Sequence, residues 1–123
     1  MNLRVARHTS NLKSIIHFYK NILGLDILGE FKNHNDYDGV FLGKENMSWH
    51  LEFTVSNLKP DHKPDEDDLL VFYINNPQEY SALKEKFKDN GIEEIIPKNP
   101  YWQENGVNYL DPDGFGIIIS VIK

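Results

Sequence analysis

The chain has 123 residues, of which 40% are hydrophobic, enough apolar material for one compact domain but too little for two independent ones. Its 13 basic and 19 acidic residues give a net charge of −6, which repels a phosphate backbone, so we expect no nucleic-acid partner. The absence of cysteine excludes disulfides, thiolate metal sites and a cysteine nucleophile. Neither an apolar leader nor a bilayer-long apolar stretch is present, which predicts a cytoplasmic protein with no membrane partner.

In the first half of the chain, alternating apolar residues over 3–9 predict a strand. A helix is expected next, because Ser10 or Asn11 can cap it, apolar residues recur at helical spacing over 12–23, and Gly24 can end it in a left-handed conformation. Three more strands are predicted, over 25–31, 37–42 and 48–55. The first half therefore reads as βαβββ.

An acidic, proline-containing segment over 58–67 has no apolar periodicity and is predicted to be a solvated linker. After it the pattern starts again, with a strand over 69–74 and a helix that begins at Asn76 and Pro77 and ends at Gly91. Three further strands are predicted, over 92–96, 106–110 and 115–122. The second half is again βαβββ, so the predicted modules are 1–57 and 68–123.

The predicted fold class is α+β, with two βαβββ modules that form a curved mixed sheet around a shared cavity and carry their helices on the outside. Such a repeat is physically reasonable, because one sheet with a helix on its outer face leaves the inner face bare. Side chains alternate between the two faces of a strand. In residues 49–54 this places Trp49, Leu51 and Phe53 on the helix side and His50, Glu52 and Thr54 on the cavity side.

Two motifs carry a family resemblance. Residues 11–19, followed by 23–25, are similar to the first helix of vicinal oxygen chelate proteins (the glyoxalase, bleomycin-resistance and extradiol dioxygenase superfamily), and residues 111–115 resemble the turn before their last strand. Four shorter segments also resemble one glyoxalase-like branch of that superfamily: 4–7, 36–40, 50–53 and 99–102.

The resemblance also implies where a metal would be bound. Metal-dependent members hold a divalent cation with four side chains, one from the first and one from the fourth strand of each half, and these positions correspond to Arg4, Glu52, Leu69 and Ile118. Only Glu52 is a suitable ligand, because a guanidinium is permanently charged and hydrocarbon side chains have no donor atoms. We therefore expect no metal and no cofactor. A non-standard metal site built from His8, His50 and Glu52 is an open alternative.

Arg4 can take the place of the metal's charge, because the family geometry brings it near Glu52, where the two side chains can pair in a fork. One interpretation is a salt bridge that only holds the cavity wall in register. In the other, Arg4, or Arg7 at the cavity edge, recognises an oxyanion on a ligand while Glu52, as catalytic base, or His50 handles a proton. Related glyoxalases carry a substrate-binding cation at the position of His8. Because histidine is titratable, charge at this position is expected to depend on pH.

Aromatic residues form the second group of predicted ligand-binding positions. Tyr73 shares a strand face with Leu69 and Val71 and is predicted to point into the cavity. Tyr101 and Trp102 belong to a segment between two strands, where they either cover the open end of the sheet or form a lid that stacks on a flat ligand.

Two main functions follow. The first is a metal-independent binding protein for a small anionic or planar ligand. The second is a glyoxalase-like lyase or isomerase of the lactoylglutathione lyase type, with Glu52 as base and either Arg4 or a non-standard metal stabilising an enediolate-like intermediate. A third possibility is a domain that acts mainly through dimerisation. The resemblance implies a homodimer, because members often complete their cavities with a second chain.

Overall fold

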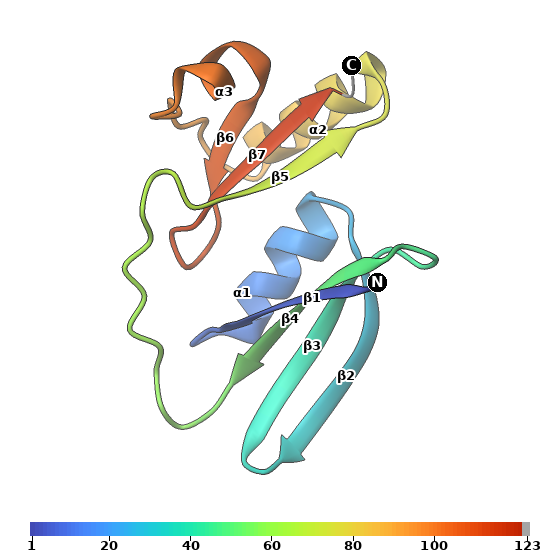
Figure 1. Cartoon of the computed structure of the whole chain (residues 1–123), viewed down its shortest axis with the longest axis vertical. Helices are drawn as coiled ribbons and strands as arrows, with labels where there is room; N and C mark the ends of the chain where they lie inside the picture. Colours follow the sequence, from blue (N-terminus) through green and yellow to red (C-terminus); the bar gives the residue numbers. More distant parts are fainter. Residues whose placement is uncertain (122–123) are drawn as a thin grey trace. The chain divides into compact units, whose positions relative to one another are not determined.

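The computed structural model describes residues 1–121 and has the predicted α+β class (Figure 1). The chain forms two compact units, Met1–His62 and Lys63–Lys123. The division falls inside the segment 58–67. No helix among the described residues is both long and apolar enough to cross a membrane.

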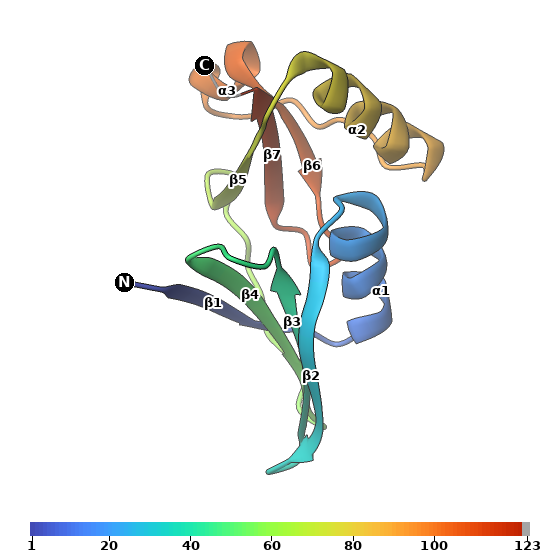
Figure 2. The same cartoon turned by 90° about the vertical axis from the view of Figure 1, so that its right-hand side faces the viewer.

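Unit 1 has the predicted βαβββ order (Figure 2). Its elements in chain order are β1 (Leu3–His8), α1 (Leu12–Ile16), the π-helix η1 (His17–Ile22), β2 (Asp26–His34), β3 (Tyr37–Gly43) and β4 (Trp49–Val55). The strand order in the sheet is β1-β4-β3-β2, in which β1 runs parallel to β4 and the other neighbours are antiparallel. The single predicted helix is thus an α-helical turn that continues as a wider π-helix.

The helix of unit 1 begins and ends as its sequence predicts. The Asn11 side chain accepts a hydrogen bond from the Ser14 N–H at 3.2 Å, and Gly24 turns the chain away at φ +94°. The apolar face of the helix packs on the sheet, where the Tyr19 and Phe53 ring centroids lie 4.9 Å apart. The predicted alternation in β4 is confirmed, because Leu51 and Phe53 are both buried.

Unit 2 differs from its prediction. Its elements are β5 (Leu69–Ile74), α2 (Pro77–Asp89), α3 (Pro100–Asn105), β6 (Val107–Leu110) and β7 (Gly116–Val121). The strand order is β5-β7-β6, with β5 parallel to β7. Residue 122 of the predicted last strand lies outside the described residues.

The predicted strand over 92–96 is wrong, because this segment makes only one isolated bridge, between Ile95 and Asn108. Two adjacent glutamates have low strand propensity, and Pro97 has no N–H with which to extend a ladder. The following segment, predicted as a connection between strands, contains the short helix α3. Its cap is Asn99, whose side chain accepts a hydrogen bond from the Tyr101 N–H at 3.0 Å.

The ends of α2 follow the sequence closely. The Asn76 side chain accepts a hydrogen bond from the Glu79 N–H at 2.8 Å, and Pro77 occupies the first turn. At the other end Gly91 adopts φ +73°, its N–H donates to the Lys88 carbonyl, and the N–H of the next residue donates to the Phe87 carbonyl. This pair of bonds is a Schellman motif, and it fixes the direction in which the chain leaves the helix.

Candidate ligand-binding site

The parallel pairing of β1 and β4 brings the predicted polar residues together. Arg4 lies opposite His50 in the register, and Glu52 is two residues farther along β4. The Arg4 Nε donates a hydrogen bond to His50 Nε2 at 2.9 Å, and Arg4 Nη1 lies 3.8 Å from Glu52 Oε2. Because His50 Nε2 accepts this bond, its ring carries its proton on Nδ1. All three side chains project from the sheet face that α1 and η1 do not cover, since the buried Leu51 and Phe53 occupy the other face.

Phe41 completes this group, and sequence reasoning missed it. Phe41 lies opposite Glu52 in the antiparallel β3–β4 register, and the Arg4 Cζ sits 4.7 Å from the centroid of its ring. The His50 ring approaches the same ring edge-on at 5.8 Å. The signal was available in the alternation of strand 37–42, which places Phe41 on the same face as Glu52 once the strands are paired. We call Arg4, Phe41, His50 and Glu52 the Arg4 group.

The exposure of the two charged side chains differs. The Arg4 side chain is 52% exposed, whereas that of Glu52 is 16% exposed. A separation of 3.8 Å is too long for a hydrogen bond, so the predicted fork between the two is replaced by a single loose contact. Such a contact near solvent contributes about 1 kcal/mol at most. The guanidinium is therefore held in place mainly by His50 and Phe41 and keeps donors available to solvent.

His8 lies on the same strand as Arg4, four residues along, and has its own partners. Its Nδ1 lies 2.7 Å from Thr54 Oγ1, and its Nε2 lies 3.0 Å from the Leu58 carbonyl oxygen and 3.1 Å from Ser56 Oγ. A carbonyl only accepts, so Nε2 carries a proton. Within residues 1–121, no three His, Asp or Glu side chains gather as metal ligands. The structure thus does not bring His8, His50 and Glu52 together as a metal site.

Arg7 lies on the opposite side of the sheet from Arg4. Its Nη2 donates to the Tyr19 hydroxyl at 3.1 Å, and its Cζ lies 5.1 Å from the Phe53 ring centroid. Arg7 was predicted at the cavity edge as an alternative to Arg4. Residues three apart on a strand point to opposite faces, so Arg7 lies on the helix side of the sheet, and its predicted role in ligand binding stays a prediction.

The predicted aromatic residues all belong to unit 2. Tyr73 is 55% exposed and lies opposite Ser120 in the β5–β7 register. Tyr101, also 55% exposed, and the partly buried Trp102 share α3, where their rings meet edge-on with centroids 4.8 Å apart. These two residues form a local pair on a helix, and their predicted role in ligand binding stays a prediction.

The four positions at which the superfamily holds a metal occupy equivalent places in the two sheets. Arg4 faces His50 with Glu52 two residues beyond, and in unit 2 Leu69 faces Gly116 with Ile118 two residues beyond. A Cβ at Gly116 would lie 2.5 Å from Leu69 Cδ2, so the leucine covers the glycine, and Ile118 is fully buried. With hydrocarbon at two positions and a guanidinium at a third, these residues do not fit a divalent cation.

Comparisons with known proteins agree with this fold and extend over nearly the whole chain. Residues 3–54 match the YycE-like N-terminal domain, and residues 67–120 match the YycE-like C-terminal domain. Protein YycE of Bacillus subtilis (strain 168) is 44% identical, over 98% of this chain and 88% of the relative. The crystal structure of a Bacillus subtilis YycE protein of unknown function superposes with a TM-score of 0.89 at 42% identity, covering 99% of this chain and 90% of the other.

More distant structures share the fold alone. The trypanothione-dependent glyoxalase I of Leishmania major has a TM-score of 0.76 at 22% identity, covering 98% of this chain and 86% of the enzyme. The fosfomycin resistance protein FosX of Listeria monocytogenes has a TM-score of 0.71 at 11% identity, covering 98% and 89% respectively. Fold and relatives together define a vicinal oxygen chelate protein of the glyoxalase and fosfomycin-resistance type. Within that superfamily, the chain belongs to the YycE-like family.

Proposed function

We propose that this protein binds a small planar anion at the Arg4 group of unit 1 and does so without a divalent metal. The proposal rests on the observation that the Arg4 guanidinium is held in place and also accessible to solvent. The guanidinium is fixed by the hydrogen bond to His50 at 2.9 Å and by the Phe41 ring at 4.7 Å, yet half of the side chain is exposed. A fixed and accessible guanidinium is suited to a carboxylate or another oxyanion, because its N–H groups match two acceptor oxygens.

The preference for a planar ligand rests on the rings around Arg4. Phe41 contacts Phe31 of β2 with ring centroids 5.8 Å apart, so apolar aromatic surface continues across the sheet from the guanidinium. A flat ligand can place its charged end on Arg4 and its ring along this surface. Glu52 competes weakly for Arg4, since its carboxylate lies 3.8 Å from the Arg4 Nη1. A bound anion can therefore replace it as the closer partner.

Benzoate is the probe for this proposal, with cyclohexanecarboxylate as its non-planar counterpart. We expect saturable amide shifts at Arg4, Phe41 and His50 in an NMR titration with benzoate, and weaker binding of the non-planar acid. Arg4→Gln should weaken benzoate binding about tenfold or more, because a charge-assisted hydrogen bond contributes about 1.5–3 kcal/mol. Lys44→Gln is the matched control, since Lys44 is exposed and pairs only loosely with Asp26 at 3.4 Å. Equal losses in the two variants, or none in Arg4→Gln, would contradict the proposal.

A second candidate function is favoured by Glu52. Its carboxylate is mostly covered but lacks a close hydrogen-bonded arginine, which leaves it free to act as a base. In an isomerase reaction Glu52 would remove a proton from a carbon beside a carbonyl and return it to the neighbouring carbon, with Arg4 facing the oxyanion, so no oxidant is required. The hemithioacetal of methylglyoxal is the test substrate. Turnover that disappears in Glu52→Gln would support the enzyme, and no turnover above the uncatalysed rate would leave binding as the function.

A further inference from the structure

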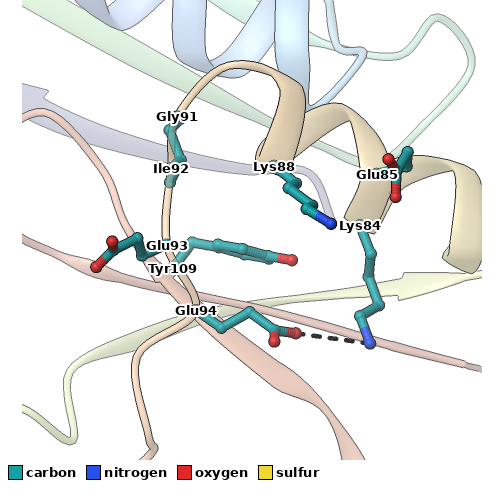
Figure 3. Close-up of a pocket in the computed structure, with 8 residues that line it drawn as sticks. All are labelled: Lys84, Glu85, Lys88, Gly91, Ile92, Glu93, Glu94 and Tyr109. Atoms are coloured by element: carbon teal, nitrogen blue, oxygen red, sulfur yellow. Dashed lines mark ion pairs between the residues drawn. The ribbon is translucent and has the colours of Figure 1, made fainter.

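Unit 2 contains a pocket of about 600 Å³ that is separate from the Arg4 group (Figure 3). Its walls come from the second half of α2, from the chain that follows it, and from β6. The lining residues are Lys84, Glu85, Lys88, Gly91, Ile92, Glu93, Glu94 and Tyr109. All of them belong to the same unit, so the pocket is a property of unit 2 itself.

The pocket results from the way the chain leaves α2. The Schellman motif at Gly91 directs the chain back along the helix, and residues 92–96 then make only the bridge from Ile95 to Asn108 instead of a full strand. A paired strand here would lie along β6. Instead, residues 92–94 border the pocket as an irregular connection, together with the second half of α2 and Tyr109 of β6.

Tyr109 contributes a buried side chain with a polar hydroxyl group to the pocket wall. The side chain is 1% exposed, and its ring stacks on Phe87 with centroids 3.9 Å apart and planes 7° apart. Its hydroxyl extends toward the lysine ammonium groups of α2 (Figure 3). Among residues 1–121 the structure gives this hydroxyl no hydrogen-bond partner. Burial, reinforced by Glu94, raises the pKa of Tyr109, so the phenol stays protonated and can donate.

The charged groups around this hydroxyl are of both signs and only partly paired. Lys84 Nζ lies 3.6 Å from Glu94 Oε1, a half-exposed pair of little strength. For Lys88, Glu85 and Glu93, no ion pair is found within the described part of the chain. In Figure 3 the Lys88 ammonium lies on the side toward which the Tyr109 hydroxyl extends, and the Glu93 carboxylate lies on the other side of the ring.

We propose that this pocket binds a small zwitterion, a molecule that carries one carboxylate and one ammonium group. The ligand carboxylate is received by the Lys88 ammonium and the Tyr109 hydroxyl, because these two donors have no acceptor within residues 1–121. The ligand ammonium is received by the Glu85 carboxylate, which in Figure 3 lies on the same side of the Tyr109 ring as the Lys88 ammonium. Two lysines against three glutamates give the lining a charge of −1 (2 − 3), which opposes a polyanion such as a nucleotide and is compatible with a neutral zwitterion.

Free L-glutamine and L-leucine are suitable probes, with acetate and ethylammonium as single-charge controls at equal ionic strength. We expect saturable amide shifts at Gly91, Ile92 and Tyr109 with at least one amino acid, and at least tenfold weaker binding of both controls. Tyr109→Phe keeps the stacked ring and removes only the hydroxyl, and Lys88→Met removes the ammonium. Each should weaken binding several-fold, whereas Lys86→Met on the same helix, outside the pocket, should leave it unchanged.

Three results would overturn the proposal: no saturable shifts with either amino acid, acetate binding as tightly as the amino acids, or equal affinity in wild type and both pocket variants. An unchanged NMR spectrum outside the pocket shows that each variant is folded. If Lys88→Met does not fold, Tyr109→Phe alone decides the outcome, because its ring packing is retained.

Discussion

The two units use the same parallel strand pair to display opposite chemistry. In unit 1 the diagonal positions across β1 and β4 hold Arg4 and Glu52, and in unit 2 the equivalent positions across β5 and β7 hold Leu69 and Ile118. The backbone register is the same, but one pair is charged and partly exposed, while Ile118 is fully buried. The strand register therefore sets the position of a side chain, and the residue type determines whether that position is polar or part of the apolar core.

The units also differ in how their sheets are completed. In unit 1 the hairpin of β2 and β3 supplies two strands, so four strands are paired. In unit 2 the segment equivalent to β2 forms only the bridge between Ile95 and Asn108, and the short helix α3 follows before β6. Residues 92–94 of this segment line the pocket that Tyr109 and Lys88 also border. One unit thus has polar residues on a complete sheet, and the other has a pocket beside an incomplete one.

The largest effect is expected when a carboxylate is placed in unit 2 at the position where unit 1 has Glu52. Ile118→Glu should lower the free energy of unfolding by about 4 kcal/mol or more, because a carboxylate would be buried among hydrocarbon without a partner. Urea unfolding measures this loss. A variant within about 1 kcal/mol of wild type would show that the site tolerates charge, as its counterpart in unit 1 does.

The next test separates the two faces of β4. Leu51→Ala should cost about 2–5 kcal/mol, since the side chain is buried against the helix. Glu52→Ala, one residue along, should cost less than about 1 kcal/mol, because its contact with Arg4 is long and near solvent. Thermal and urea unfolding of both variants give the comparison. Similar losses at the two positions would mean that the faces are not distinct.

A pH dependence is expected from Tyr109 in unit 2. Its pKa is raised from the ordinary value of about 10, first by burial and then by Glu94. Above about pH 10 the unfolded chain releases this proton while the folded chain retains it, so stability falls as pH rises, by up to about 1.4 kcal/mol per pH unit.

Unfolding of wild type and Tyr109→Phe between pH 8.5 and 11 checks this sign. The phenylalanine variant should lose less stability over that range, with a smaller remaining slope from Tyr80, whose pKa is also raised by burial. Parallel pH profiles for the two proteins would show that the phenol is not protected in the fold.

The smallest expected effect concerns the start of α2. Asn76→Ala removes the acceptor of the Glu79 N–H bond and should cost about 1 kcal/mol. Asn76→Asp, which keeps a capping oxygen, is the matched control and should stay close to wild type. Equal destabilisation by both substitutions would show that the amide group, rather than the cap, matters here.

Local signals predicted most of the fold. Both predicted helices begin after an asparagine whose side chain caps the first turn, Asn11 and Asn76. Both end at a glycine that adopts a positive φ, Gly24 and Gly91. The strand expected over 92–96 had local signals against it in its two glutamates and in Pro97, and its pairing also depends on a partner edge and on how the preceding helix ends. Apolar alternation alone does not distinguish a paired strand from an extended connection.

The candidate site was predicted in part. Alternation placed His50 and Glu52 on one strand face, the family resemblance placed Arg4 beside Glu52, and the structure brings the three together. Arg7 was predicted at the cavity edge, although alternation puts it on the helix side beside Tyr19. Phe41 was missed because its neighbours come from a different strand, and such contacts depend on register that one sequence does not contain.

Benzoate binding to the metal-free protein tests most directly whether Arg4 receives an anionic ligand. In the presence of a chelator, calorimetry or NMR titration should show saturable binding by wild type, at least tenfold weaker binding by Arg4→Gln, and unchanged binding by Lys44→Gln. Binding that appears only after a divalent metal is added, or that is the same in wild type and Arg4→Gln, would contradict the claim that Arg4 receives the ligand.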